Sequence, residues 1–448
     1  MSLRTFLEEM EAKREIIHVK DRVSLRFEAA SIMKAFDGGP ILSFDNVEGS
    51  ETKIVANVCG TRQRLCSALK VAPEKLYLRL TEAWKTPVPP KTVKEAAVKE
   101  VVEKPRLSRI PILTHFEKDA GPYVTSAIVS ARSLDGKIEN VSFHRLLVLD
   151  DSHLTLRLVP RHLFKLWEAA KEAGEDLPVA ISLGLHPAVS VAAASSVPFG
   201  VSEFGIANAL LGGKLRLVKG EIVDCYGPAD SEMMLEGVLS VREGVVEGPF
   251  GDVTGTYDIE RKQPVIEVLS VMHRRDYVYQ ALLPSGTEHR LLMGLPRETM
   301  IWESVSKVVP EAKAVNLSIG GCSWLHAILS IEKKKEEDGK NALKAAFSAH
   351  PSLKHAVVVD ADIDVFNLEE VEWAIATRFQ ASEDVMVIPN VRGSSLDPSA
   401  DQETGLTTKV GVDATRPLDK PREKFEKVKI PTSPRITELI KKLKETYS

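Results

Sequence analysis

The pattern of apolar and polar positions divides the chain into three regions. Near the N-terminus, apolar residues recur at helical spacing behind a serine that is placed to cap a helix. These positions are Ser2, Leu3, Phe6, Leu7 and Met10. A second helix is predicted over residues 27–36, and strands over 41–44 and 53–58. The first region is therefore expected to be a small α/β unit.

The middle region is rich in short β-branched runs. Six runs predict strands, at residues 123–129, 141–149, 154–159, 179–183, 215–223 and 265–271. Strands this closely spaced, with few long helices between them, are typical of an antiparallel barrel or sandwich.

Helices and strands alternate after about residue 297. Strands are predicted at 314–319, 355–360 and 384–388, and helices at 341–349 and 368–379. This order is typical of a βαβαβ domain. A final helix rich in Lys, Glu and Leu is predicted from Pro434 to Tyr447.

Residues 86–111 differ from both neighbours. They contain Pro-Val-Pro-Pro, then Lys, Glu and Val repeats, and no aromatic residue, so we expect a linker with room for one exposed helix. A chain of 448 residues is too long for one core. The fold class is therefore a multidomain α/β (α+β) protein. Its expected domains are an N-terminal α/β domain (1–112, with the linker), a central β domain (113–296) and a C-terminal α/β domain with a tail helix (297–448).

Composition narrows the function classes. A net charge of -4 gives no case for binding nucleic acid or an anionic membrane, and no apolar run approaches membrane-spanning length. The four cysteines have neither C-x-x-C spacing nor the density of a secreted scaffold, so we expect reduced thiols in a cytoplasmic protein. Few Gln and Asn beside many Lys, Arg and Glu are typical of a thermophilic source.

Polar side chains precede a predicted buried strand in the stretch from Ile138 to Asp150. Asn140 lies in this stretch, while His162 and Glu203 open two predicted helices. One carboxylate with an amide and an imidazole suits Mn²⁺ or Mg²⁺ and leaves coordination sites for a phosphate. Taken singly, each residue has a simpler interpretation: a turn amide, a surface or core histidine, and an exposed acid in a first helical turn.

Arg145 lies at the edge of the same strand, and a buried arginine is held only where a carboxylate balances it. Glu247 and Asp252 lie five residues apart, with Gly-Pro-Phe-Gly between them. An arginine balanced by one acid can clamp a substrate carboxylate, which leaves the other acid for proton transfer. The alternative is a pair of solvated acids that flank a hairpin turn.

Two further patterns resemble nucleotide-binding and calcium-binding motifs but do not match them. The pairs Gly212-Gly213 and Gly320-Gly321 fit neither a phosphate loop nor a dinucleotide fingerprint. Asp360, Asp362 and Asp364 alternate as in a calcium loop but lack its required glycine, which favours an ordinary strand end and loop.

Five motifs, in order and spacing, make the sequence resemble the UbiD family of decarboxylases, which use prenylated flavin mononucleotide (prenylated FMN). They are Asn-x-Ser-x-x-Arg at Asn140–Arg145, Pro-x-His at Pro160–His162, Glu203, Glu-Gly-Pro-Phe-Gly-Asp at Glu247–Asp252, and Asp-Ile-Asp-Val-Phe-Asn from Asp362. The resemblance runs from the first helix to about Pro417. It implies that the central domain is a flavin-binding split β-barrel.

The resemblance also implies roles for individual residues. Asn140, His162 and Glu203 are expected to hold Mn²⁺ against the cofactor phosphate, with K⁺ nearby. The expected cofactor contacts are Asn140, Ser142, Phe143, His144, Arg145, Arg161, Ser195, Ser196, Pro198 and Lys409. Arg145, Glu247 and Asp252 match the catalytic triad: Arg145 orients the substrate carboxylate, Glu247 holds Arg145, and Asp252 protonates the product. Ferulic acid decarboxylases have glutamate in place of Asp252.

The implied reaction is non-oxidative decarboxylation of an α,β-unsaturated or aromatic acid, by a homodimer or higher homo-oligomer that a flavin prenyltransferase supplies with cofactor. The short chain and thermophile-like composition resemble archaeal members that act on trans-anhydromevalonate 5-phosphate. A 4-hydroxybenzoate-type acid is the alternative. From a different class, a non-catalytic FMN-binding or assembly module has no need of the Arg145 triad. His273, Arg274 and Arg275 are candidate ligands for a substrate phosphate, or simply a solvated basic patch.

Overall fold

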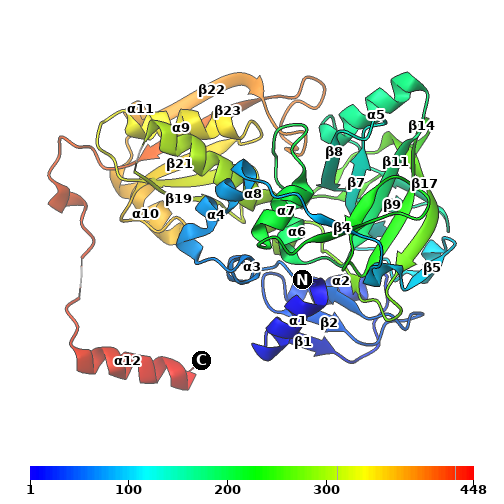
Figure 1. The fold of residues 1–448 in the computed structure, drawn as a ribbon. Coiled ribbons are helices and arrows are strands. Elements are labelled where there is room, and N and C mark those ends of the chain that lie inside the picture. The colour runs from blue at the N-terminus through cyan, green and yellow to red at the C-terminus, as the bar shows by residue number, and fades with distance from the viewer. Residues whose placement is uncertain (310, 429, 448) are drawn as a thin grey trace.

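The computed structural model describes residues 1–309, 311–428 and 430–447. Figure 1 shows an N-terminal unit beside a β-rich central unit, a separate C-terminal α/β unit, and a last helix that stands apart. In the described residues no helix is long and apolar enough to cross a membrane.

The N-terminal unit is a sheet covered by helices. Its strand order is β1 (Ile16–Val19), β2 (Ile41–Phe44), β3 (Ile54–Ala56) and β18 (Tyr279–Gln280), so the last strand comes from a segment that follows the central unit. Helices α1 (Leu3–Ala12) and α2 (Glu28–Ala35) lie beside this sheet, whereas α3 (Arg62–Leu69) and α4 (Leu76–Lys85), with a 3₁₀ turn at Pro73–Lys75, pack mainly on helices of the other two units. Ser2 caps α1 by accepting a hydrogen bond from the Thr5 N–H, as the spacing predicts.

The central unit is an antiparallel sheet. Its order is β6 (Tyr123–Val124), β9 (Leu146–Val148), β10 (His153–Leu156), β17 (Arg261–His273), β14 (Met233–Glu247), β11 (Leu177–Leu183), β7 (Ile128–Arg132) and β8 (Glu139–Phe143). All of its pairings are antiparallel, as predicted. Because β6 and β8 are the ends of this order, the described strands form an open sheet and no closed barrel.

Helices and small sheets complete the central unit. The helices are α5 (His162–Ala173), α6 (Pro187–Ala193) and α7 (Glu203–Leu210), and the hairpin of β15 (Phe250–Gly251) and β16 (Tyr257–Asp258) follows β14. Strand β14 was missed by the sequence analysis because Glu236 interrupts its apolar pattern. Glu236 is fully buried and accepts hydrogen bonds from the backbone N–H groups of residues 221–223, so it is a core residue despite its charge.

The predicted linker at residues 86–111 is wrong, because this segment is built into the central unit. Strand β4 (Lys91–Val93) pairs with β12 (Arg216–Lys219), which also pairs with β13 (Tyr226–Pro228). Strand β5 (Val101–Glu103) pairs with β17. In place of an exposed helix there are 3₁₀ turns at Ala97–Lys99 and Leu107–Arg109, and Val98 is fully buried. Composition alone cannot reveal strands this short.

The C-terminal unit has a mixed sheet, which differs from a simple βαβαβ order. Its strands are β19 (Ala312–Leu317), β20 (His326–Ile331), β21 (His355–Asp360), β23 (Leu406–Ala414) and β22 (Val385–Arg392). The three central strands are parallel and the two edge strands antiparallel. The helices are α8 (Thr287–Val308), α9 (Asp338–Ala349), α10 (Leu368–Arg378) and α11 (Ala381–Asp384), with a 3₁₀ turn at Arg422–Phe425. The predicted domain division after residue 296 falls inside α8, which continues through Pro296.

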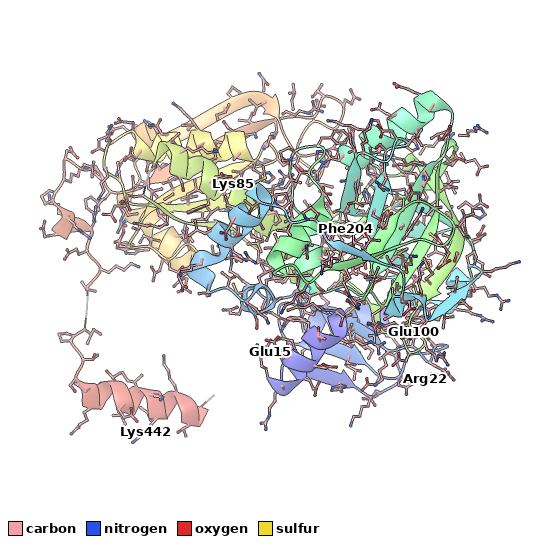
Figure 2. All side chains as sticks on the ribbon, viewed as in Figure 1. Glu15, Arg22, Lys85, Glu100, Phe204 and Lys442 are labelled. Atoms are coloured by element: carbon pink, nitrogen blue, oxygen red, sulfur yellow. The ribbon has the colours of Figure 1, made fainter. Side chains whose placement is uncertain are left out.

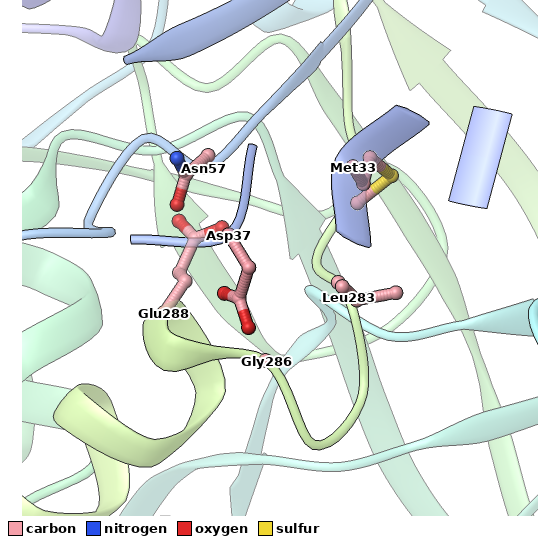
Figure 3. A pocket seen from close by; sticks show the side chains of 6 residues that line it. All are labelled: Met33, Asp37, Asn57, Leu283, Gly286 and Glu288. Carbon is pink, nitrogen blue, oxygen red and sulfur yellow. The ribbon is translucent and has the colours of Figure 1, made fainter. Parts of the chain in front are cut away.

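The first turn of α8 docks on the N-terminal unit. Glu288 is 2% exposed and accepts a hydrogen bond from the Cys59 N–H at 2.7 Å. A cavity of about 10 Å³, room for about one water molecule, lies beside it, and Figure 3 shows the side chains of Asp37, Asn57 and Glu288 gathered there. A buried carboxylate thus joins the N-terminal unit to the helix that begins the C-terminal one.

The last helix, α12 (Pro434–Tyr447), matches its predicted bounds. Its apolar residues Ile436, Leu439, Ile440 and Leu443 are all exposed, and Figure 2 shows the helix, with Lys442 labelled, apart from the rest of the protein. These four side chains therefore take no part in the hydrophobic cores of the three units.

Candidate active site

Arg145 lies between β8 and β9, and its side chain is 9% exposed. Glu247, the fully buried last residue of β14, binds it with both oxygens, since Nε donates to Oε1 and Nη2 to Oε2, each at 3.0 Å. The Tyr123 hydroxyl also donates to Oε1 of Glu247, at 3.1 Å. Burial alone would lower the pKa of Arg145, but Glu247 and two aspartates raise it above its ordinary value. The guanidinium is therefore permanently charged and fixed in one orientation.

Two aspartates complete the shell of Arg145. Nη1 donates to Oδ2 of Asp252, and Nη2 donates to Oδ2 of Asp258 at 2.9 Å. Asp258 also pairs with Arg261 at 2.6 Å and with Arg157 at 3.4 Å. Three carboxylates and three guanidiniums thus meet, and their formal charges cancel.

The turn that carries Asp252 is held by close packing. The Arg145 guanidinium lies 4.5 Å from the ring centroid of Phe250, a cation–π contact. A Cβ on Gly251 would lie 2.3 Å from the Phe116 ring, so only glycine fits there. Asp119 accepts the Gly251 N–H at 3.0 Å. The Gly-Pro-Phe-Gly sequence therefore positions the acids on either side of it.

His289 lies in the first turn of α8, close enough to Asp252 and Arg145 for their charges to affect its ring. Burial lowers the pKa of His289, the Asp252 carboxylate opposes this effect, and Arg290 and Arg145 add to it. The Ser285 N–H donates to Nδ1 at 3.1 Å, so the neutral ring carries its proton on Nε2. The sequence analysis missed both His289 and Asp258. The position of His289 close to the start of a helix could have been noticed in the sequence, but no sequence pattern connects His289 with Asp252.

Two of the three predicted metal ligands are brought together. Nδ2 of Asn140 donates to Oε1 of Glu203 at 3.2 Å, and the Val141 N–H donates to Oε2 at 2.8 Å. Glu203 begins α7 and is 3% exposed, and burial raises its pKa to about 7. Its hydrogen-bond donors are neutral, so a bound cation would supply the missing positive charge.

His162, the third predicted ligand, begins α5 and packs edge-on against Phe199, with ring centroids 5.3 Å apart. It has no hydrogen bond to Asn140 or Glu203. Across the described ranges, no three His, Cys, Asp or Glu side chains form a group that could hold a metal ion. The donor types of Asn140, His162 and Glu203 still fit a divalent ion, because carboxylate and amide oxygens with one imidazole are ligands that Mn²⁺ accepts.

The other residues expected to contact the cofactor lie on separate elements. On β8, the Ser142 hydroxyl donates to Oδ1 of Asn140 at 3.0 Å and lies 3.0 Å from Nε2 of His144, while Phe143 packs on the N-terminal core. Burial lowers the pKa of His144 to about 4, so its ring is neutral. Ser195 is committed elsewhere, as it donates to the Val191 carbonyl and accepts from Trp84. Ser196 and the exposed Pro198 follow it in the loop before α7.

Arg161 and Lys409, two residues expected to contact the cofactor, belong to different units. Arg161 is the N-cap residue of α5 in the central unit, and its side chain is exposed. Lys409, on β23 of the C-terminal unit, is 4% exposed and donates to the Pro351 carbonyl at 2.5 Å. Although the Arg161 side chain reaches the surface, the protein around it lowers its pKa, and burial lowers the pKa of Lys409. In the described residues neither cation pairs with a carboxylate, so their charge is available for an anion.

The fold and the site define a carboxy-lyase, an enzyme that removes CO₂ from an acid. The chain belongs to the UbiD family of 3-octaprenyl-4-hydroxybenzoate carboxy-lyases. It matches the family's N-terminal domain over residues 7–84, its Rift-related domain over 91–287 and its C-terminal domain over 290–414.

Relatives and solved structures agree with this assignment. The anhydromevalonate phosphate decarboxylase of Methanothermobacter thermautotrophicus is 44% identical over 95% of this chain and 99% of its own. The gallate decarboxylase of Lactiplantibacillus plantarum is 31% identical over 89% and 88%. The structure of the UbiD-class enzyme HmfF from Pelotomaculum thermopropionicum in complex with FMN is 41% identical, with a TM-score of 0.94 over 96% of this chain and 98% of that one.

Proposed function

We propose that the protein converts trans-anhydromevalonate 5-phosphate to isopentenyl phosphate by non-oxidative, reversible decarboxylation with prenylated FMN. The observation that carries this proposal is the near full-length similarity to five relatives named anhydromevalonate phosphate decarboxylase, which are 41% to 44% identical to this chain. An aromatic acid is the second candidate, and it is favoured by the similarity to a gallate decarboxylase.

Arg145 would hold the substrate carboxylate. A guanidinium has five N–H groups. In Arg145 the Nε–H and the two Nη2 N–H groups bond Glu247 and Asp258, and one of the two Nη1 N–H groups bonds Asp252. The carboxylate would therefore bind at Nη1 and take the place of Asp252, while Glu247 keeps Arg145 oriented. Once displaced from Arg145, Asp252 would take up a proton from solvent and deliver that proton to the product carbon.

Prenylated FMN, when bound, takes up the electron pair that decarboxylation releases. Asn140, His162 and Glu203 would hold Mn²⁺ at the cofactor phosphate, with K⁺ nearby. Ser142, Phe143, His144, Ser195, Ser196 and Pro198 would line the flavin, and Arg161 and Lys409 would bind its phosphate from two units. These roles follow from the family resemblance and from the uncompensated charges on Glu203, Arg161 and Lys409.

A flavin prenyltransferase would supply the cofactor, and we expect a cytoplasmic homodimer or higher homo-oligomer. A dimeric form is described for an evolved HmfF, whose structure is 39% identical to this chain with a TM-score of 0.90. We further propose three functional units, with the flavin on the central unit and the lysine-bearing C-terminal unit facing it.

The test is a substrate comparison with protein co-expressed with a flavin prenyltransferase. Its kcat/KM is measured for anhydromevalonate phosphate, 4-hydroxybenzoate and gallate. We expect the phosphorylated acid to be preferred by at least about 100-fold, because a site built for a charged group discriminates strongly against acids that lack it. Preference for either aromatic acid would contradict the proposal.

A further inference from the structure

Two members of the basic patch predicted to bind a substrate phosphate already lie beside acids. His273 lies 3.6 Å from Glu103 and Arg274 lies 3.6 Å from Glu232, while the Arg275 side chain is exposed. A less exposed cation without an acidic partner is therefore a better candidate for the substrate phosphate.

Arg297 on α8 is a half-buried cation that lacks an acidic partner. In the described part of the chain it forms no ion pair, and its one side-chain hydrogen bond is from Nη1 to the sulfur of Met300 at 3.6 Å. On the same helix, Glu298 pairs with Arg62. A guanidinium that is partly removed from water and has no acidic partner is unfavourable. Such a group is expected where an anion binds.

The charges of Arg297, Arg161 and Lys409 converge. Burial lowers the pKa of Arg297 to about 10, and the charge of Arg161 adds to this effect. The same three cations affect His350. Burial lowers the pKa of His350 to about 3, and the charges of Arg297, Lys409 and Arg161 lower it further. In the part of the chain that the structure describes, Arg297 and Lys409 each make one side-chain hydrogen bond, to the Met300 sulfur and the Pro351 carbonyl, and neither pairs with a carboxylate. The region between α5, α8 and β23 therefore carries positive charge that no carboxylate there pairs with.

One phosphate does not balance this region. A phosphate monoester carries about -1.5 to -2 at neutral pH, which Arg161 and Lys409 alone would match. A divalent ion held by one carboxylate, Glu203, would add a further positive charge. Arg297 therefore remains in excess of what the cofactor phosphate needs.

Arg297 is also held ready for a ligand. Its guanidinium lies 5.4 Å from the ring centroid of Trp324, whose Nε1 donates to Ser394 at 3.1 Å and whose carbonyl accepts from Nε2 of His350 at 2.9 Å. A Cβ on Gly294 would lie 2.9 Å from Ser323, so glycine lets α8 approach this loop. The aromatic face fixes the plane of the guanidinium and leaves most of its N–H groups free.

Helix α8 connects this cation to the catalytic acids. His289 lies close to Asp252 and Arg145, and Arg297 follows eight residues later, about 12 Å along the helix axis. We propose that Arg297 binds the phosphate of a phosphorylated unsaturated acid whose carboxylate is held by Arg145. This inference rests on the proposed function and assigns the residue that selects the phosphorylated substrate.

The test compares Arg297→Met and Arg297→Lys with Lys307→Met, which removes an exposed charge from the same helix. Loss of a charge-assisted contact predicts an increase of about 10- to 100-fold in KM for the phosphorylated acid in Arg297→Met. Arg297→Lys, which keeps the charge but loses the planar fork, should fall between this variant and wild type. Flavin occupancy, read from the visible spectrum, should stay at the wild-type level in all three variants.

Binding of isopentenyl phosphate to flavin-loaded protein, measured by calorimetry, gives a readout independent of turnover. We expect the Kd to rise by the same factor in Arg297→Met and to be unchanged in Lys307→Met. Wild-type affinity in Arg297→Met overturns the inference, and so does loss of flavin, which would place Arg297 at the cofactor phosphate. If the wild-type protein prefers an aromatic acid, the proposed function fails. If the wild-type protein prefers the phosphorylated acid but Arg297→Met leaves KM and Kd unchanged, only the role of Arg297 is refuted.

Discussion

Oδ2 of Asp258 lies 2.9 Å from Nη2 of Arg145, the nitrogen that also serves Oε2 of Glu247. Asp258 therefore belongs to the charged group around Arg145, and it links Arg145 to Arg157 and Arg261. The arginine is held from two directions before any substrate binds.

Asp258→Asn should loosen Arg145 without removing a group that reacts. We expect kcat/KM to fall by about 10-fold or more, because one charge-assisted bond to Arg145 is weakened and Arg157 and Arg261 lose their shared counter-charge. Steady-state kinetics at equal flavin occupancy measure this. Asp135→Asn, a change at an exposed acid in a turn, is the control and should behave as wild type. Equal activity in both variants would remove Asp258 from the positioning group.

Asp252→Asn and Glu247→Gln should separate the two acids of the motif. Loss of the proton donor should lower kcat by at least about 100-fold and block solvent deuterium uptake into product, with KM nearly unchanged because the Arg145–Glu247 pair survives. Glu247→Gln should raise KM and lower kcat together, since it leaves Arg145 poorly oriented. Wild-type turnover and deuterium delivery by Asp252→Asn would show that another group, such as His289, donates the proton.

The sequence predicted the members of this charged group that lie in recognisable motifs and missed those that no motif marks. Glu247 and Asp252 are separated by one rigid turn, so their common role was visible in the chain. Asp258 reaches Arg145 across 113 residues, and only because the β15–β16 hairpin folds back. His289 approaches from α8, whose start lies before the predicted domain boundary.

The same contrast between local patterns and distant contacts holds for the fold. Helices with clear apolar spacing, such as α1 and α12, were predicted correctly, because periodicity is a local property. The strands β4 and β5 are three residues long and pair with distant partners, so a Pro- and Lys-rich segment was mistaken for a linker. Buried Glu236 hid β14 for a related reason: its compensation comes from backbone N–H groups elsewhere in the chain.

Glu203→Gln should reduce both manganese content and retained flavin. The variant keeps the hydrogen bond from the Val141 N–H but loses the buried negative charge that a cation would balance. Metal analysis and the visible spectrum of purified protein measure the two occupancies. Glu139→Gln, at the neighbouring acid bonded to Ser202, is the control and should keep both. Full occupancy in Glu203→Gln would exclude Glu203 as a ligand.

Arg161→Met and Lys409→Met should each weaken flavin retention, because each removes an unpaired charge from the region expected to hold the cofactor phosphate. A loss of one charge-assisted contact corresponds to about 10- to 100-fold in Kd. Flavin titration of apo protein measures it, and Lys165→Met, one turn after Arg161 on α5, is the matched control. Similar affinity in Lys409→Met and wild type would mean that the C-terminal unit does not contact the phosphate.

Glu288 gives the protein a pH-dependent stability. Burial raises the pKa of Glu288 to about 7 from an ordinary value of 4.5, and in the described structure its Oε2 has no hydrogen-bond partner. Between these two pH values the unfolded chain has released the proton and the folded chain retains it. The folded state then binds more protons, so this group makes the free energy of unfolding fall as pH rises from about 4.5 to about 7, with no further change above.

Glu288→Gln should abolish this loss, since the neutral amide can still accept the Cys59 N–H. At pH 8 the variant should be more stable than wild type by up to roughly 3 kcal/mol, and the difference should vanish near pH 4.5. Thermal unfolding midpoints across this pH range measure it. Glu298→Gln, ten residues along the same helix, is the contrast: it leaves Arg62 without its buried partner and should destabilise the protein at pH 8. A midpoint for Glu288→Gln at or below that of wild type at pH 8 would show that the Glu288 charge is compensated in the folded protein.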